Sequence, residues 1–184
     1  MLYTRKGDNG TTKTFGCDQR ISKSSSIAEA LGSLDEINSL LGLCKVKSAD
    51  QGFTVPDGRP FAEVVGEVQH NLFIIQAELA GADKHLVEVK VKGIEGVIDT
   101  IEQELPPITS FFVSGGTELA ATFDYARTVA RRAERRVVQV VKEEALVLGD
   151  FTLPYLNRLS SLLYALARLS NHKSGKLEEP PTYA

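Results

Sequence analysis

The sequence predicts an all-α fold, an up-and-down bundle of about five helices. Apolar residues recur at steps of three or four over several long stretches, as they do on the buried face of a helix. No series of segments alternates apolar and polar residues in the way that paired strands do. The 184 residues suit one domain, residues 1–184, and the 42% of hydrophobic residues can form a core without a disulfide or structural metal.

The first helix is expected to begin near Ser26, because Ser26 and Glu29 have the spacing of a capping box. One buried stripe then follows at steps of three or four: Ile27, Leu31, Leu34, Ile37, Leu41 and Cys44. Residues 48–60 are rich in Gly, Pro and Asp, and this composition predicts a loop.

Two further helices are expected between about residues 61 and 105. One should run from about Phe61 to Ala82, with an apolar residue at every third or fourth position. The next should run from about Gly93 to Leu105, because the prolines that follow at 106–107 cannot continue a helix.

The last two helices lie in the second half of the chain. The fourth is expected from about Thr117 to Leu148, with a buried face that small residues line in part. The fifth is expected from about Thr152 to His172, with proline in its first turn, where proline is favoured. Residues 174–184 are polar and contain two prolines, so we expect a flexible tail.

The overall charge restricts the kind of partner. A net charge of -3 and a pI near 5.7 argue against a general binder of nucleic acid or acidic membrane, so any anion site must be local. No apolar run approaches the roughly 18 residues of a membrane span, and no signal peptide is recognisable, so the cytoplasm is the expected compartment. The two cysteines, Cys17 and Cys44, are expected to be reduced. The three histidines, His70, His85 and His172, match no metal-ligand spacing.

The stretch "TRKGDNGTTKTFG", residues 4–16, has the composition of a phosphate-binding loop. It combines two close glycines, several threonine hydroxyls, and the basic residues Arg5, Lys6 and Lys13. Backbone N–H groups and cations of this kind can surround an anion. The alternative is a frayed N-terminus, and the stretch alone does not decide between the two.

Five arginines within ten residues mark the fourth helix. Arg127, Arg131 and Arg135 share one face, and Arg132 and Arg136 form a neighbouring row. Such a run is most often a solvated face. In an acidic protein, however, it is a local excess, and arginine suits paired contacts with phosphate or carboxylate.

Other polar residues interrupt apolar segments. Asp35 and Glu36 in the first helix either face solvent or pair with an arginine of another helix or subunit. Asn157 and Ser161 lie one turn apart in the fifth helix and suit either structural hydrogen bonds or ligand contacts.

Two aromatic residues, Phe111 and Phe112, precede the Gly115–Gly116 turn. They can be core anchors, or they can present a ring to a flat ligand. Composition alone leaves both possibilities open.

Four segments together resemble a known family. "YTRKGDNGTT", "EALGSLDEINS", "FFVSGGTELAATFDYARTVARRAERR" and "YLNRLSSLLYALAR" are similar, in order and spacing, to the PduO-type ATP:cob(I)alamin adenosyltransferases. The resemblance runs from Tyr3 to about His172. It implies a ferritin-like five-helix bundle that forms a homotrimer with ATP at the subunit interface. It also implies transfer of the 5′-deoxyadenosyl group of ATP to cob(I)alamin, with Mg²⁺ as cofactor, and adenosylcobalamin and triphosphate as products.

The resemblance also implies roles for individual residues. The residues 1–23 would form a nucleotide-binding loop, and the implied ATP-binding set is Thr4, Arg5, Lys6, Gly7, Thr12, Lys13, Lys23, Arg131, Arg132, Glu134, Arg135 and Asn157. Asn157 would also help to hold Mg²⁺ through the nucleotide. Asp35 and Arg127 would pair across the subunit interface beside the corrinoid, and Phe111 would lie under the corrin ring. Arg131, Asn157 and Phe111 form the implied catalytic set, and a reductase and an adenosylcobalamin-dependent enzyme are possible partners.

The sequence departs from the family pattern at a few positions. The family usually reads "NRLSD", whereas Ser161 stands here in place of the carboxylate. Ser24 and Ser25 replace frequent acidic residues, and Leu31 replaces a frequent tyrosine. The loss of charge at Ser161 favours an alternative, a non-catalytic carrier or sensor of ATP or corrinoid with the same fold. A plain helical scaffold is the remaining alternative.

Overall fold

The computed structural model describes residues 2–14, 19–144 and 146–183. It confirms an all-α bundle of five helices: α1 (Ser26–Gln51), α2 (Phe61–Leu79), α3 (Glu88–Glu104), α4 (Glu118–Glu143) and α5 (Thr152–Lys173). The sequence did not predict the two short strands before α1, β1 (Thr11–Thr12) and β2 (Ile21–Ser22), which pair antiparallel. Strands of two residues are too short to show an alternating pattern.

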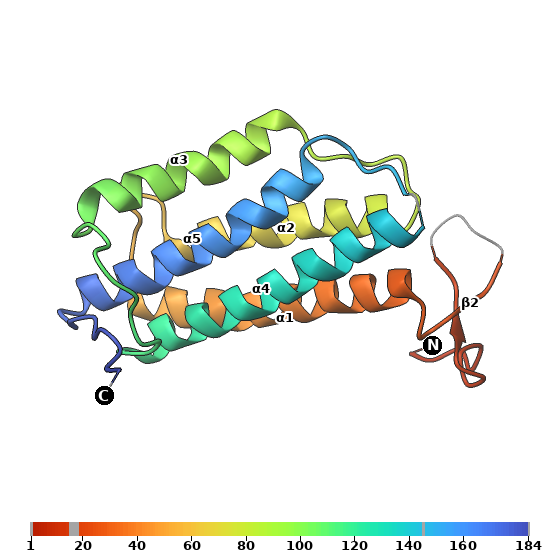
Figure 1. Cartoon of the computed structure of the whole chain (residues 1–184), viewed down its shortest axis with the longest axis horizontal. Coiled ribbons are helices and arrows are strands. Elements are labelled where there is room, and N and C mark those ends of the chain that lie inside the picture. The colour runs from red at the N-terminus through yellow and green to blue at the C-terminus, as the bar shows by residue number, and fades with distance from the viewer. Residues whose placement is uncertain (1, 15–18, 145, 184) are drawn as a thin grey trace.

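The helices pack as a long bundle (Figure 1). α4 packs against both α1 and α5, while α2 packs against α1 and α3 packs against α5. The β1–β2 hairpin projects from one end of the bundle, and the segment after α5 lies at the opposite end (Figure 1). No helix in the described ranges has the length and apolar character needed to cross a bilayer.

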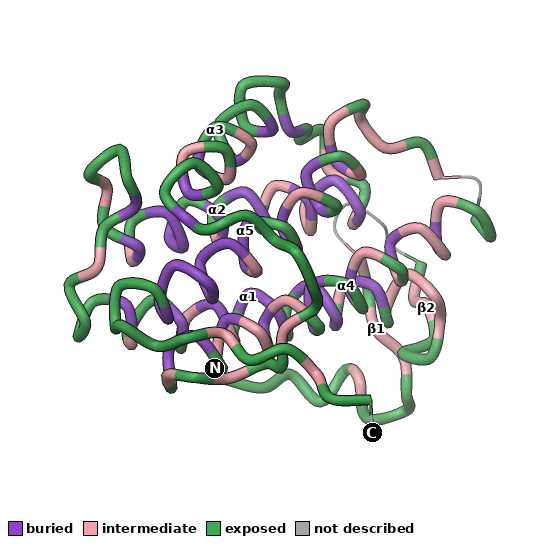
Figure 2. The backbone as a smooth tube through the Cα atoms, turned by 60° about the vertical axis from the view of Figure 1, so that its left-hand side comes forward, coloured by how far each residue is buried: buried purple, intermediate pink, exposed green. Residues whose placement is uncertain are grey.

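The predicted apolar stripes form the core, and Figure 2 shows buried residues on the inward faces of the helices. The ring of Phe123 packs edge-on against Phe61, with centroids 6.2 Å apart. Tyr155 is 1% exposed and accepts a hydrogen bond of 3.0 Å from Asn71 Nδ2. Burial raises the pKa of Tyr155 to about 12, so this phenol stays neutral.

The start of α1 differs from the prediction by one residue. The N-cap is Ser25, whose side chain accepts a hydrogen bond from the backbone N–H of Ala28. The predicted capping box of Ser26 and Glu29 is therefore wrong, because the third helical position is Ala28, which has no carboxylate to return the bond. Ser26 instead donates a hydrogen bond of 2.6 Å to Glu144 at the end of α4.

Other helix ends move by about one turn. α1 continues to Gln51 and ends at Gly52, whose φ of 65° is the left-handed conformation that terminates helices. α3 begins earlier than predicted, because Val91 is buried and extends its apolar stripe by one turn. α4 ends at Glu143 rather than near 148, and the chain then turns back toward α5.

A buried carboxylate fixes the end of the bundle where this turn occurs. Glu78 of α2 is 4% exposed and accepts hydrogen bonds from the backbone N–H of Gly149 and the hydroxyl of Thr152. Its Oε1 also lies 2.7 Å from Nδ1 of His85. The hydrogen bond to Glu78 raises the pKa of His85.

Candidate functional site

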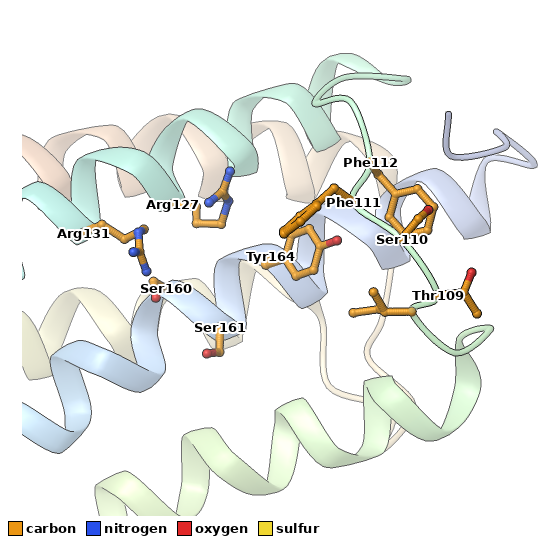
Figure 3. Close-up of a pocket in the computed structure, with 10 residues that line it drawn as sticks. Thr109, Ser110, Phe111, Phe112, Arg127, Arg131, Ser160, Ser161 and Tyr164 are labelled. Carbon is orange, nitrogen blue, oxygen red and sulfur yellow. The ribbon is translucent and has the colours of Figure 1, made fainter. Parts of the chain in front are cut away.

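A hollow of about 580 Å³ lies between α4, α5 and the loop of residues 106–117 (Figure 3). α4 and α5 present polar and aromatic side chains to it, and the loop presents a continuous edge. The lining residues are Ile108, Thr109, Ser110, Phe111, Phe112, Arg127, Arg131, Ser160, Ser161 and Tyr164.

The loop side of this hollow is aromatic. The side chain of Phe111 is 82% exposed, so it does not serve as a core anchor. Tyr164 of α5 lies below the Arg127 guanidinium, whose carbon is 5.8 Å from the ring centroid. Arg127 Nε is also 3.4 Å from Asp124 on the same helix. An exposed ring and a half-buried ring beside a cation suit a ligand with a flat apolar face and polar edges.

Four of the five arginines of α4 fall into two groups. Arg132 forms an ion pair with Glu36, and Arg136 Nε lies 3.5 Å from Glu29, so both join α4 to α1. Of the two roles predicted for Glu36, pairing with an arginine of another helix is therefore confirmed. Arg131 and Arg135 stay exposed, and Arg131 points into the hollow (Figure 3).

The implied pair of Asp35 and Arg127 is not formed within the chain. Arg127 contacts Asp124 and Tyr164, and Asp35 lies exposed on α1. A pair between subunits stays a prediction.

Asn157 belongs to a polar chain that crosses three helices. Its Nδ2 donates to Glu134 of α4 at 3.1 Å, and its Oδ1 accepts from Arg158 at 2.8 Å. Arg158 Nε in turn donates to Glu95 of α3 at 2.8 Å. The carboxylate and amide oxygens at Glu134 and Asn157 are the ligand type that Mg²⁺ prefers. No group of three or more His, Cys, Asp or Glu side chains within the described ranges could hold a metal, so Mg²⁺ here would also need phosphate oxygens.

The N-terminal loop closes around a second hollow of about 470 Å³. Arg20 holds it in shape: Nε donates to the Thr11 hydroxyl at 2.6 Å, Nη2 donates to the Thr11 carbonyl at 2.8 Å, and Nη2 also contacts the Lys6 carbonyl. A frayed N-terminus does not fit this geometry. The lining residues are Tyr3, Thr4, Arg5, Lys6, Gly7, Asp8, Thr11, Thr12, Lys13, Arg20 and Lys23.

The backbone of this loop is as specific as its side chains. Arg5 and Gly10 have φ angles of 60° and 77°, and the left-handed conformation is uncommon for a residue such as arginine. A Cβ on Gly7 would lie 3.1 Å from the Lys23 amine and 3.2 Å from the Thr11 carbonyl oxygen, so a larger residue would crowd this cation and push its flexible side chain outward. The loop thus gathers five cations and one carboxylate around one hollow.

The two hollows share no residue. The loop projects from the end of the bundle at which α1 begins and α4 ends (Figure 1). Arg131 lies about 18 Å from Glu143 along α4, at roughly 1.5 Å per residue. The chain therefore brings Phe111, Arg127 and Arg131 together, and joins Asn157 to Glu134, but it does not bring its own loop to them.

Comparison with known proteins settles which family has this arrangement. The family model described as cobalamin adenosyltransferase matches residues 2–170. The chain belongs to this family. It is 38% identical over 178 residues to the corrinoid adenosyltransferase PduO of Citrobacter freundii, a match that covers 93% of this chain and 50% of that protein. It thus spans about half the length of this relative.

Other members of the cobalamin adenosyltransferase family are closer in length. The corrinoid adenosyltransferase of Bacillus subtilis is 37% identical, over 95% of this chain and 88% of that protein. Among solved structures, a variant of the PduO-type ATP:corrinoid adenosyltransferase from Lactobacillus reuteri, complexed with cobalamin and ATP, superposes with a TM-score of 0.87 at 29% identity. That match covers 100% of this chain and 97% of the other.

Sequence reasoning missed several residues of both hollows. Tyr164 follows Asn157 and Ser161 on the same face of α5, so the helical period could have indicated it. Arg20 and Thr11 carried no comparable signal, because their contacts depend on the path of the hairpin.

Proposed function

We propose that the chain is an ATP:corrinoid adenosyltransferase, which transfers the 5′-deoxyadenosyl group of ATP to cob(I)alamin and yields adenosylcobalamin and triphosphate. The observation that carries this proposal is the hollow beside Phe111 and Tyr164, with Arg127 and Arg131 on its α4 side. The names of the relatives support the same activity, since they are corrinoid adenosyltransferases. The Lactobacillus reuteri protein, which has the same fold, was solved with both cobalamin and ATP.

The reaction requires alignment and charge rather than a protein nucleophile. The electron pair of cob(I)alamin forms the bond from cobalt to C5′, and the bond from C5′ to the phosphate oxygen breaks. Triphosphate then leaves with the electrons of that bond. The protein holds the reacting atoms in line and stabilises the charge of the leaving group with cations already in position. Those cations are Arg131 and Arg135 of α4, together with Arg5, Lys6 and Lys13 of the N-terminal loop.

Phe111 is suited to the corrinoid. An exposed phenyl ring beside Tyr164 offers an apolar surface to one face of a flat macrocycle and excludes water from it. In this role Phe111 would keep water and other ligands away from one face of the corrinoid, which would favour reduction of its cobalt. A reductase that delivers the electron and an enzyme that receives the product stay predictions from the sequence, as does the cytoplasmic location.

The nucleotide site is completed by a second copy of the chain in a homotrimer. The cationic loop and the exposed arginines of α4 belong to hollows that share no residue, so one chain offers only half of the site. A neighbouring subunit could bring its loop to Arg131 and Arg135, with Mg²⁺ held by phosphate oxygens and by Glu134 and Asn157. Analytical ultracentrifugation tests this part, since full activity in a monomeric fraction would contradict it.

An anaerobic assay tests the activity itself. Purified protein is mixed with Mg-ATP and chemically reduced cob(I)alamin, and the visible spectrum is followed in dim light. Growth of a light-sensitive adenosylcobalamin spectrum supports the transferase. Binding of ATP without conversion would instead support the non-catalytic carrier or sensor.

Ser161 is the observation that keeps this second candidate open. It lies exposed in the same hollow as Arg127 and Arg131, so a carboxylate at this position would add a negative charge to a hollow that both arginines line. If conversion is absent, Ser161→Asp is the first variant in which to look for it.

A further inference from the structure

The loop that carries Phe111 has little support of its own. Residues 106–111 are exposed, and the loop has no helix or strand between α3 and α4. Its conformation therefore depends on contacts that reach it from α5 and from the segment 174–183.

A buried arginine makes the first of these contacts. Arg168 of α5 is 6% exposed, and its Nε and Nη2 donate to the Glu178 carboxylate at 2.9 and 2.8 Å. Nη2 also donates to the carbonyl of Pro106 at 3.0 Å, where the loop begins. The guanidinium carbon lies 5.3 Å from the ring centroid of Phe112, next to Phe111 in the chain. One side chain thus contacts the loop at two points and the segment 174–183 at a third.

The far end of the loop is held as well. Asn171 of α5 donates to the carbonyl of Gly115 at 2.8 Å and accepts from the backbone N–H of Thr117 at 3.0 Å. The backbone N–H of Val113 donates to the carbonyl of Glu179 at 2.8 Å. Gly116 has a φ of 94°, and its missing Cβ would lie 2.5 Å from Asn171. The loop is therefore fixed at its start, middle and end.

The Arg168–Glu178 ion pair is better explained by a role in positioning the loop than by a contribution to the stability of the fold. Removing two charges from water opposes much of the attraction between them, and apolar residues often replace a buried pair without loss of stability. A bidentate arginine–carboxylate pair does fix geometry, because two parallel hydrogen bonds allow only one relative orientation. The guanidinium group of Arg168, held in this orientation, contacts the loop beside the hollow and does not join two helices.

We infer that Arg168 and Glu178 are positioning residues for the adenosyl transfer, forming a clasp that holds the 106–117 loop with Phe111 toward the hollow. This inference rests on the proposed function. The clasp acts through the loop and touches neither substrate. Loss of the clasp should lower kcat/KM for the corrinoid, which Phe111 would contact. It should leave the KM for ATP unchanged, because the proposed ATP contacts lie on α4, on Asn157 and on the N-terminal loop. The segment 174–183 then has a part in the site, although it has no helix or strand.

The test compares Glu178→Gln with Glu179→Gln in the full chain. Both variants remove one negative charge from adjacent positions, but Glu179 contacts the loop only through its backbone carbonyl, which the substitution keeps. Arg168→Lys is a third variant, which keeps the charge and loses the bidentate pair. The first readout is cleavage by chymotrypsin after Phe111 and Phe112, followed by mass spectrometry. The second is the separation of kcat from the KM values for ATP and for cob(I)alamin.

We expect cleavage of the loop to be several-fold faster in Glu178→Gln and Arg168→Lys, and unchanged in Glu179→Gln. We expect kcat/KM for the corrinoid to fall about tenfold or more in the first two variants, because small misplacements reduce rates strongly. The KM for ATP should stay within about twofold, since contacts that the variants leave intact set it.

Two results would overturn the clasp. One is equal loop cleavage and equal corrinoid kinetics in Glu178→Gln, Glu179→Gln and the parent. The other is a purely structural effect, in which kcat/KM falls equally for ATP and for the corrinoid and chymotrypsin cleavage becomes faster throughout the bundle. If the parent itself transfers no adenosyl group, the proposed function fails, and the clasp is then judged by the comparison of loop cleavage alone.

Discussion

Replacement of Arg131 by alanine separates a functional arginine from a structural one. Arg131 is exposed and lines the hollow between α4 and α5, whereas Arg136, on the neighbouring row, pairs with Glu29 of α1 at 3.5 Å. If Arg131 steadies the leaving triphosphate, its loss removes a charged donor aimed at developing charge. The loss of one such donor costs about 2.7–4 kcal/mol in the transition state, or about a hundredfold to a thousandfold in kcat.

Arg136→Ala is the matched control. It removes the same charge from the same helix one turn further on, and a solvent-exposed ion pair of this kind contributes about 0–1 kcal/mol to stability. We expect its kcat to stay within about threefold of the parent, an allowance for a weak effect on packing. The assay is anaerobic adenosylcobalamin formation at saturating Mg-ATP, with circular dichroism to verify the fold of each variant. Equal losses in the two variants would refute the reasoning, since they would reflect the charge of the helix and not the position of Arg131.

The other predictions concern the ring in the hollow, a titrating contact and a buried thiol. Phe111→Ala should lower kcat/KM for the corrinoid about tenfold to a hundredfold, because covering a ring of this size contributes about 1.5–3 kcal/mol. Val113→Ala on the same loop is the control. A change in ATP affinity with unchanged corrinoid kinetics would contradict the role of Phe111. The His85 pKa is raised by Glu78, so their contact stabilises the fold fully below the histidine pKa of about 6.5 in the unfolded chain and loses this contribution as pH rises through the higher folded pKa. Thermal melts from acidic to alkaline pH should show the advantage of the parent over His85→Ala shrinking along that rise, and an advantage that grows with pH would reverse the sign. Burial raises the pKa of Cys44 to about 12, so its thiol should resist alkylation at pH 8 until the protein unfolds, as mass spectrometry of its peptide can measure.

The helices were predictable because their signal is local. Each stripe of apolar residues is set by neighbours three or four positions away, and burial of Leu34, Ile37 and Leu41 follows that pattern. The cap of α1 was misplaced because Ser24, Ser25 and Ser26 offer equivalent hydroxyls, and only the path of the incoming chain selects among them.

The candidate site was predictable in its composition and not in its connections. The excess of arginine on α4 could be read from the sequence, but the division between paired and exposed side chains depends on where Glu36 and Glu29 of α1 lie. Arg168 stood in a run of apolar residues without a visible partner, because Glu178 lies beyond the end of α5 and reaches it only when the segment folds back. Contacts of this kind are set by tertiary structure, which a helical period does not encode.

The carboxylate of Glu78 has a consequence for the order in which the protein can fold. α5 begins after Phe151, whose side chain cannot cap it, and the hydrogen bonds from Gly149 and Thr152 at its start go to a side chain of α2. A helix normally receives its cap from a residue next to it in the chain, so its first turn can form alone. Here a side chain of α2 holds the segment at which α5 begins, through the Gly149 N–H and the Thr152 hydroxyl, and this contact couples the helix bearing Asn157, Ser161 and Tyr164 to the docking of α2. Amide hydrogens at the start of α5 should then exchange through global unfolding rather than through local fraying.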